Sequence, residues 1–162
     1  MLKLNLGCGI HPIKEFVNID IEGSCDIKKD ITTLKYDNET VDEIYMSHML
    51  EHLNREDAIE LINNCYVWLK KHGRLFISVP DIKKLGKLIN LYDDEILMSW
   101  IYGDGNNIYN FNHHWGYSEN SLKKLLNIAG FNQIEPFEPM YNDDSSFKFK
   151  DMYLSINWVC EK

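Results

Sequence analysis

The segment Lys3–Gly9, with the sequence Lys-Leu-Asn-Leu-Gly-Cys-Gly, most constrains the fold of this chain. Leu4 and Leu6 are typical of the end of a short buried strand, and the Gly7-Cys8-Gly9 triplet predicts a sharp turn directly after it. Glycine adopts positive φ angles at little cost and lets a ligand approach the main chain closely. A Gly-x-Gly turn after the first strand of an α/β sheet is a usual place for a nucleotide-like cofactor, although a tight loop without a ligand has the same pattern.

A second predicted strand, Phe16–Asp20, ends in an acid. A carboxylate at this position can accept hydrogen bonds from both ribose hydroxyls of an adenosine. In the dinucleotide-binding fingerprint a third glycine follows, and the acid lies about 20 residues further on. Here Pro12 stands at the third-glycine position and Asp20 comes much sooner, which argues against NAD or FAD. The pattern therefore favours an adenosine ligand without a pyrophosphate.

Five segments in this order resemble a known protein family. They are Leu6–Gly9, Phe16–Ile21, Ser47–Leu53, Leu69–Asp81 and Leu125–Phe131. Together they are similar to class I S-adenosylmethionine-dependent methyltransferases, and in particular to the small methyltransferase-domain proteins of the type-11 kind. The motifs are specific for the fold and for the cofactor S-adenosyl-L-methionine, but not for the substrate. Because the resemblance covers nearly the whole chain, we expect residues 1–162 to form a single methyltransferase domain.

The resemblance also implies where the cofactor binds. In this family an acid near the position of Asp30 contacts the adenine amino group, and the next backbone amide contacts a ring nitrogen. The alternative is that Asp30 is simply a solvent-exposed carboxylate in a turn. Cys8, between the two glycines, is expected to be a small apolar spacer rather than a reactive thiol. The expected cofactor-binding residues are Leu6, Gly7, Cys8, Gly9, Asp20, Ile21, Asp30, Ile31, Ser47 and His48.

The order of the segments predicts an α/β fold: a Rossmann-like, doubly wound, mostly parallel seven-stranded sheet with a C-terminal antiparallel hairpin. Later strands are expected at 41–47, 74–79, 131–137 and 152–160, and helices at 54–71, 81–91, 93–102 and 118–130. Ser118 is expected to cap its helix without a capping box, because Ser121 stands three residues on.

The first two crossovers are expected to be trimmed to loops or single turns. Gly9–Phe16 and Asp20–Asp30 are both short, whereas parallel strands usually need a dozen or more connecting residues. One face of the sheet would then be thinly covered. The oligomeric state stays open, but such a face would favour a homodimer.

Composition excludes several classes of partner. The net charge is −8 and no block of basic residues occurs, so a nucleic-acid substrate is disfavoured. No run of 18 apolar residues occurs, and the chain begins without a signal peptide, so we expect neither a membrane span nor export. The four cysteines form no Cys-x-x-Cys pair and are typical of reduced thiols in a cytoplasmic protein.

The segment His48–His52 spells His-x-x-Glu-His, a zinc-peptidase motif. That motif needs a metallopeptidase helix and a distant third ligand. Here it follows a strand directly, and the similar methyltransferases carry Ser-His-x-Leu-Glu-His without a metal. No metal is therefore expected. Ser47 and His48 are predicted to edge the cofactor pocket, and Glu51 and His52 to shape the start of a helix.

The loop that contains His113 and His114 should overhang the methyl donor in this fold. A histidine is a reasonable general base for a hydroxyl or an amine. We expect His114, or failing that His113, to be catalytic, with Asp81 as a further candidate. Loop packing for the histidines and a helix cap for Asp81 are the alternatives. Three aromatic residues could line an apolar pocket or simply pack: Phe111, Trp115 and Tyr117.

The predicted activity is methyl transfer from S-adenosylmethionine to an O or N atom of a small-molecule acceptor. Similar small methyltransferases often modify sugars or other metabolites of surface-glycan pathways, which implies an acceptor only by loose analogy. One alternative is a catalytically inactive module of the same fold that binds the cofactor or regulates a partner. A zinc hydrolase is the third hypothesis, and it would require stoichiometric metal.

Overall fold

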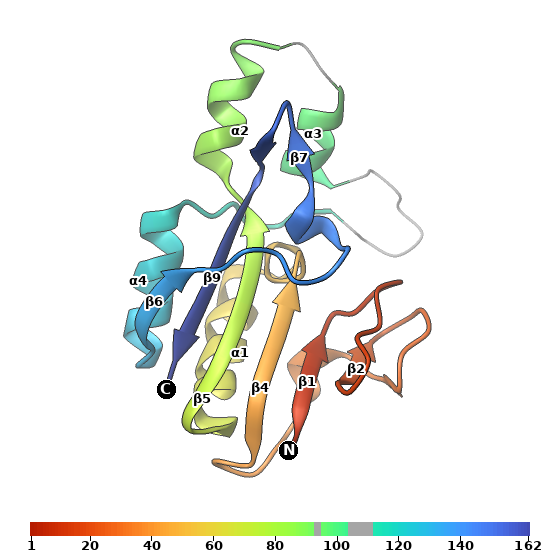
Figure 1. Ribbon diagram of the computed structural model, residues 1–162, viewed down its shortest axis with the longest axis vertical. Helices are drawn as coiled ribbons and strands as arrows, with labels where there is room; N and C mark the ends of the chain where they lie inside the picture. Colours follow the sequence, from red (N-terminus) through yellow and green to blue (C-terminus); the bar gives the residue numbers. More distant parts are fainter. Residues whose placement is uncertain (93–94, 104–111) are drawn as a thin grey trace.

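A seven-stranded sheet forms the centre of the computed structural model, which describes residues 1–92, 95–103 and 112–162 (Figure 1). The first five strands in the sheet order run parallel, and β9 runs antiparallel to both of its neighbours. The predicted fold is therefore confirmed, including the C-terminal antiparallel hairpin. The strands, in their order across the sheet, are β3 (Ile27–Lys28), β2 (Val17–Asp20), β1 (Lys3–Leu6), β4 (Val41–Ser47), β5 (Leu69–Pro80), β9 (Ser155–Glu161) and β6 (Asn132–Pro136).

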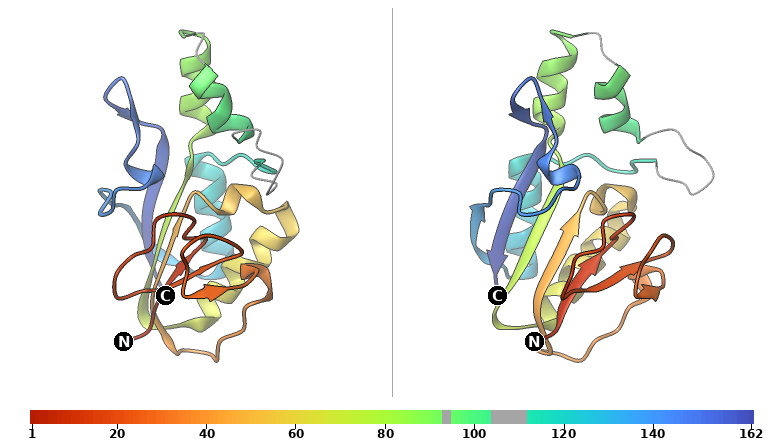
Figure 2. Two further views of the ribbon diagram at one scale, coloured as in Figure 1. Left: turned by 90° about the vertical axis from the view of Figure 1, so that its right-hand side faces the viewer. Right: turned by 45° about the vertical axis from the view of Figure 1, so that its right-hand side comes forward.

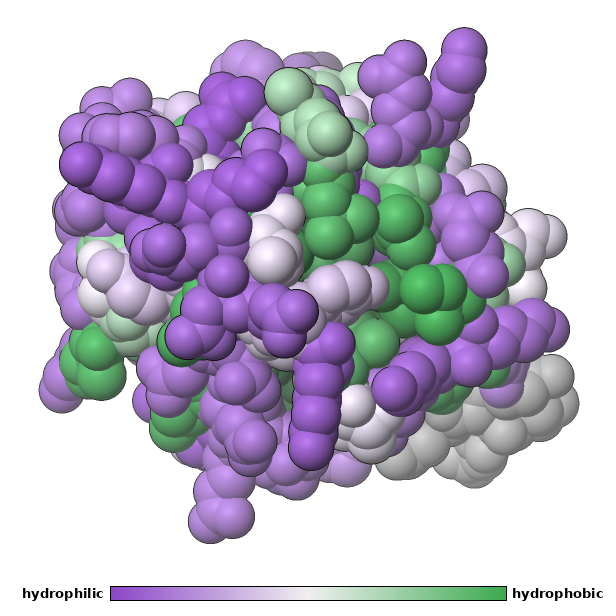
Figure 3. All heavy atoms as spheres, turned by 90° about the horizontal axis from the view of Figure 1, so that it is seen from below, coloured by the Kyte–Doolittle hydropathy of each residue, from purple (hydrophilic) through white to green (hydrophobic). Residues whose placement is uncertain are grey.

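Helices α1 (Arg55–Trp68) and α4 (Glu119–Ala129) lie on one side of the sheet (Figure 2). Side chains alternate along a strand, so β4 directs Ile44 and Met46 into the main core and Tyr45 to the opposite face. On that opposite face Tyr45 packs with residues of loops, among them Ile13 and Phe137. Seen from the end where both termini lie, hydrophilic side chains surround the apolar ones that reach the surface (Figure 3).

A second layer stands beyond the carboxyl end of β5 (Figure 1). It consists of α2 (Ile82–Ile89), α3 (Glu95–Tyr102) and the hairpin of β7 (Lys148–Phe149) and β8 (Met152–Tyr153). Leu85, Leu88, Leu97 and Leu154 are buried between these elements. None of the described helices is long and apolar enough to cross a membrane.

Buried asparagines hold the trimmed crossover between β1 and β2, where residues 7–16 form turns and extended segments. The Asn18 Oδ1 atom accepts from the Ile13 N–H at 2.7 Å and from the Asn5 amide at 2.9 Å. The backbone and side-chain amides of Asn18 both donate to Asp26 Oδ2, at 2.8 and 2.9 Å. The short connection is thus stabilised by hydrogen bonds, and the predicted trimming is confirmed. Between β3 and β4 the chain forms the single 3-10 turn η1 (Ile31–Thr33).

Helix α1 ends at Trp68, three residues before the predicted end at Lys71, and β5 begins at once. Periodicity alone would continue the helix, but Leu69 is extended, fully buried and paired with Val41 of β4. The backbone amides of Glu39 and Thr40 donate to the last two carbonyls of α1, at 3.1 and 2.9 Å. These contacts from a distant loop satisfy the helix end, which no local pattern indicates.

Helix α4 begins with a capping box, so the prediction that it lacks one is wrong. Ser118 Oγ accepts from the Ser121 N–H at 3.3 Å, and Ser121 Oγ accepts from the Ser118 N–H at 2.9 Å. A serine hydroxyl thus takes the part usually played by Glu or Gln. The strand predicted at 152–160 begins later, because β9 starts at Ser155. The residues before it form the 3-10 turn η3 (Asp144–Ser146) and the β7–β8 hairpin.

Candidate functional site

The two glycines after β1 have different surroundings. Gly7 has φ +71°, and a Cβ atom added to it would lie 2.2 Å from Met49 Cγ, so only glycine fits beneath the chain that leaves β4. Gly9 has φ +50°, and a Cβ atom there would meet nothing within 4 Å. The main chain at Gly9 is therefore open to a ligand, which is the condition that a nucleotide-like cofactor requires.

Asp20, at the end of β2, lies directly beside this open stretch. Its Oδ2 atom accepts from the Gly9 N–H at 2.8 Å and its Oδ1 atom accepts from the Glu22 N–H at 3.1 Å. Each carboxylate oxygen has a second lone pair, so the group keeps acceptor capacity for ribose hydroxyls. Gly23 was not predicted to belong to the site, but a Cβ atom there would lie 2.4 Å from the Gly9 carbonyl oxygen. Glycine at this position lets the chain after β2 pack against the glycine turn.

The other residues expected to contact the cofactor's adenosine part lie in varied environments. Leu6 and Ile31 are buried, whereas Ile21 is exposed next to Asp20. Asp30 caps η1, because its Oδ1 atom accepts from both the Thr32 N–H and the Thr32 hydroxyl, at 2.9 and 2.7 Å. Cys8 is buried, and burial raises the pKa of its thiol to about 11. The thiol is therefore protonated at neutral pH, as the spacer interpretation requires.

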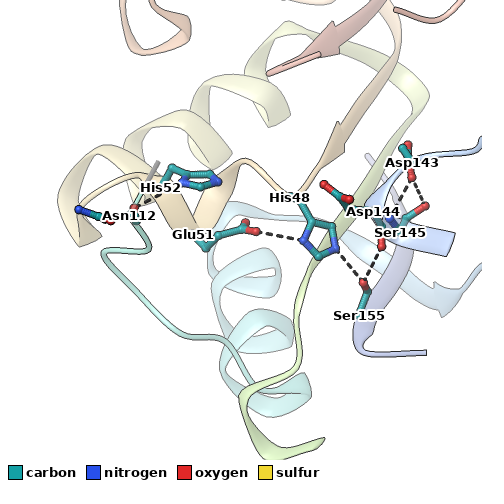
Figure 4. Close-up of polar contacts among 8 residues, drawn as sticks. All are labelled: His48, Glu51, His52, Asn112, Asp143, Asp144, Ser145 and Ser155. Carbon is teal, nitrogen blue, oxygen red and sulfur yellow. Dashed lines mark hydrogen bonds and ion pairs between the residues drawn. The ribbon is translucent and has the colours of Figure 1, made fainter. Parts of the chain in front are cut away.

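Ser47 ends β4, and His48 follows it in a strained conformation with φ +50°. His48 Nε2 lies 2.7 Å from Ser155 Oγ, and Nδ1 lies 3.3 Å from Glu51 Oε1 (Figure 4). The ring also packs edge-on against Trp100. A non-glycine residue at positive φ costs about 1–2 kcal/mol, and these contacts hold it there. His48 thereby connects the end of β4 with the start of β9 and with Glu51 in the turn after β4.

Glu51 is the centre of a cluster of histidines. It lies in the 3-10 turn η2 (Leu50–His52), and its side chain is only 1% exposed. His52 follows it, and the His52 ring lies 4.9 Å from the ring of His113, measured between centroids. Burial raises the pKa of the Glu51 carboxyl, but the neighbouring His48, His52 and His113 lower it more, so the pKa lies below its usual range. The carboxyl group thus lies buried beside three histidine side chains.

The segment 112–115 is held on η2 by backbone hydrogen bonds. The Glu51 carbonyl accepts from the N–H groups of His114 and Trp115, at 2.8 and 3.2 Å. His52 Nδ1 lies 3.3 Å from the Asn112 carbonyl oxygen (Figure 4). These contacts bring residues that are some 60 positions apart in the chain to the same end of the sheet.

The three candidate bases differ in their positions. His113 is half-buried beside Glu51 and His52, and burial lowers its pKa, with the Glu51 carboxylate opposing this only in part. His114 is exposed. Asp81 is 3% exposed and caps α2, since its Oδ1 atom accepts from two backbone amides and Oδ2 lies 3.7 Å from Lys84 Nζ.

The aromatic residues of the same loop differ in how far they are buried. Trp115 is partly exposed and lies under the Arg55 guanidinium, 5.1 Å from its centre. Tyr117 is fully buried and belongs to the main core, which favours packing as its role. Phe111 lies outside the described residues.

Comparison with known proteins agrees with this arrangement. Residues 7–135 match the family described as a methyltransferase domain, which is more than half of the chain. No curated protein matches the sequence.

Solved structures share the fold at low sequence identity. A SAM-dependent methyltransferase from Archaeoglobus fulgidus is 21% identical with a TM-score of 0.62, over 99% of this chain and 85% of that one. A methyltransferase from Mesorhizobium loti is 15% identical with a TM-score of 0.62, over 99% and 90%. The 1,6-didemethyltoxoflavin-N1-methyltransferase of Burkholderia thailandensis, solved with its substrate and S-adenosylhomocysteine, is 12% identical with a TM-score of 0.63, over 99% and 70%.

The family match, the strand order and the open glycine turn beside Asp20 lead to the same conclusion. The chain belongs to the methyltransferase-domain family, and its fold is the one found in solved class I S-adenosylmethionine-dependent methyltransferases.

Proposed function

We propose that this protein transfers a methyl group from S-adenosylmethionine to an oxygen or nitrogen atom of a small-molecule acceptor. The observation that carries the proposal is the open main chain at Gly9 next to the Asp20 carboxylate. The similar toxoflavin-pathway enzyme methylates a nitrogen of a small molecule, and the net charge of −8 argues against nucleic acid as the acceptor. A sugar or a surface-glycan precursor is the acceptor class that the sequence resemblance favours.

In this proposal the amino-acid end of the cofactor lies near Gly7 and Gly9, and its ribose lies on Asp20. Ile21 and the Asp30–Ile31 pair border the adenine, while Ser47 and His48 edge the pocket. The bound cofactor supplies the electrophilic methyl group. The chain's own residues have to bind and orient it, align the acceptor and keep water out, since methyl transfer is an in-line displacement.

A histidine of the loop after α3 takes the proton from the acceptor. His114 is the first candidate, because it is exposed while its backbone N–H is fixed on Glu51. His113 is the second. Asp81 is the weakest of the three, because its carboxylate already caps α2 and lies near Lys84.

The test is single-turnover transfer of a labelled methyl group to a panel of hydroxyl- and amine-bearing small molecules, sugars included. Methylation of at least one member, together with cofactor binding by calorimetry, is the expected result. Cofactor binding without transfer to any acceptor would instead favour the inactive, partner-regulating module. A homodimer and a cytoplasmic location are further predictions, which gel filtration with light scattering and cell fractionation address.

A further inference from the structure

We propose that Glu51, His52 and His113 bind one divalent transition-metal ion, with zinc as the best-suited ion. Each of the three side chains offers a ligand atom, and these atoms all lie within 4.8 Å of one another. Zinc binds histidine nitrogen and carboxylate oxygen at about 2.0–2.2 Å, so tetrahedral ligands lie about 3.4 Å apart. A contraction of the longest separation by up to about 1.4 Å would therefore complete the site.

The state of the Glu51 carboxylate points to a cation. The side chain is 1% exposed, and neither carboxylate oxygen has a hydrogen-bond partner among the residues that the structure describes. Glu51 Oε1 forms an ion pair with His48 Nδ1 at 3.3 Å. A buried charge is costly unless it is paired or coordinates a metal. A bound cation would satisfy the remaining acceptor capacity.

The histidines are arranged as metal ligands usually are. His52 Nδ1 lies 3.3 Å from the Asn112 carbonyl, so a proton on Nδ1 is donated there and the lone pair is on Nε2. A ligating histidine commonly donates its other N–H to a backbone carbonyl in this way. His113 follows Asn112 directly, and the hydrogen bonds from His114 and Trp115 to the Glu51 carbonyl hold this segment on η2.

This ligand set differs from the one that the His-x-x-Glu-His motif predicts. The motif would use His48 and His52, but His48 bonds to Ser155 and pairs with Glu51 instead (Figure 4). No metal is expected from the sequence because the motif directly follows a strand and because similar methyltransferases carry it without a metal, whereas a zinc-peptidase motif also needs a distant third ligand. Tertiary packing supplies one in His113, which the sequence separates from His52 by 61 positions.

The inference rests on the proposed function for its role in catalysis. Three protein ligands leave a fourth position open, as in catalytic zinc sites. An acceptor hydroxyl bound there would lose its proton more readily, because the metal lowers the pKa of a bound oxygen. The proton passes to His114 or to water, the acceptor oxygen forms the bond to the methyl carbon, and the bond from that carbon to the sulfonium sulfur breaks.

The experiment uses the full chain, freed of metal with a chelator and titrated with zinc by calorimetry and with cobalt by visible absorption. The expected result is about one ion per chain, with affinity at least about 10-fold weaker in His113→Ala and in Glu51→Gln. His72→Ala is the matched control, since His72 pairs with Glu161 at 2.6 Å on the surface, and its affinity should not change. Far-UV circular dichroism shows whether each variant is folded. If Glu51→Gln is unfolded, the zinc affinity of the loop variant His113→Ala still tests the inference.

Equal zinc affinity in the wild type and in His113→Ala would overturn the inference. Binding of S-adenosylmethionine to the metal-free protein is measured in parallel. If no zinc binds but the cofactor binds and methyl transfer proceeds, the metal inference fails and the proposed function stands. If zinc binds as expected but no acceptor is methylated, the proposed function fails and the metal site stands.

Discussion

The glycine turn with Asp20 and the histidine cluster around Glu51 lie at the same end of the sheet but are built in different ways. Gly9 and Asp20 are only 11 positions apart, and hydrogen bonds with backbone N–H groups satisfy the carboxylate of Asp20. The Glu51 cluster joins two segments some 60 positions apart, and its carboxylate is buried without a hydrogen bond among the described residues. The first region is suited to hold a cofactor, and the second to act on a proton or a metal. Changes in the first should therefore alter affinity, and changes in the second should alter turnover.

The largest expected effect is a loss of turnover when the catalytic histidine is replaced. Replacing the catalytic histidine, which we expect to be His114, with alanine should lower turnover by about 10²–10⁴-fold, the usual value of general-base catalysis. Cofactor affinity, measured by calorimetry, should stay nearly unchanged because the cofactor region is intact. His72→Ala is the control for loss of a surface histidine. If His113→Ala and His114→Ala both keep near-wild-type turnover, the base lies elsewhere, with Asp81 next, or the acceptor needs none.

The two glycines should differ in how much stability they contribute. Gly7→Ala should lower the free energy of unfolding by about 2–5 kcal/mol, since a Cβ atom would clash with Met49 and positive φ adds strain. Gly9→Ala adds the same backbone strain, but the new Cβ atom would meet no neighbour, so a loss of about 1–2 kcal/mol in the free energy of unfolding is expected. Urea denaturation measures both. Equal losses in the two variants would show that the contact of Gly7 with Met49 is unimportant.

A substitution of Asp20 tests directly whether the glycine turn and Asp20 bind the cofactor. Asp20→Ala should weaken S-adenosylmethionine binding by about 1.5–3 kcal/mol, because charge-assisted hydrogen bonds are lost. Asp37→Ala, at an exposed position next to a turn and outside the proposed site, serves as the control for removing a carboxylate, and its affinity should not change. Calorimetry that finds unchanged affinity in Asp20→Ala would remove Asp20 from the site. Tighter binding of NAD than of S-adenosylmethionine would contradict the cofactor assignment itself.

The smallest effect concerns Cys8, inside the glycine turn. Because burial raises its pKa from 9.0 to about 11, it carries about 100-fold less thiolate at neutral pH than an ordinary cysteine. Iodoacetamide at pH 7.5 should therefore label the half-buried Cys25 first, and mass spectrometry of peptides reads this out. Below its raised pKa most of Cys8 is the protonated thiol, so labelling there should rise as the pH increases toward 11. Fast labelling of Cys8 at pH 7.5 would mean that the turn is more open than its burial indicates.

Local signals in the sequence were enough to predict the order of the main elements, and the structure confirms that order. Apolar runs, turn residues and caps are local signals, so β1, the glycine turn, β4 and the start of α1 at Asn54 could be predicted. The acid at the end of β2 belongs to the same local pattern, because parallel neighbouring strands end at one edge of the sheet.

Other features depend on contacts that residue patterns do not reveal. The end of α1 depends on amides from residues 39–40, and the capping box of α4 depends on the rotamer of Ser121. The burial of Glu51 and the approach of His113 need packing between segments that are remote in the sequence. Residue type and spacing cannot report such contacts, because they arise only when the loop before α4 lies on the turn that follows β4.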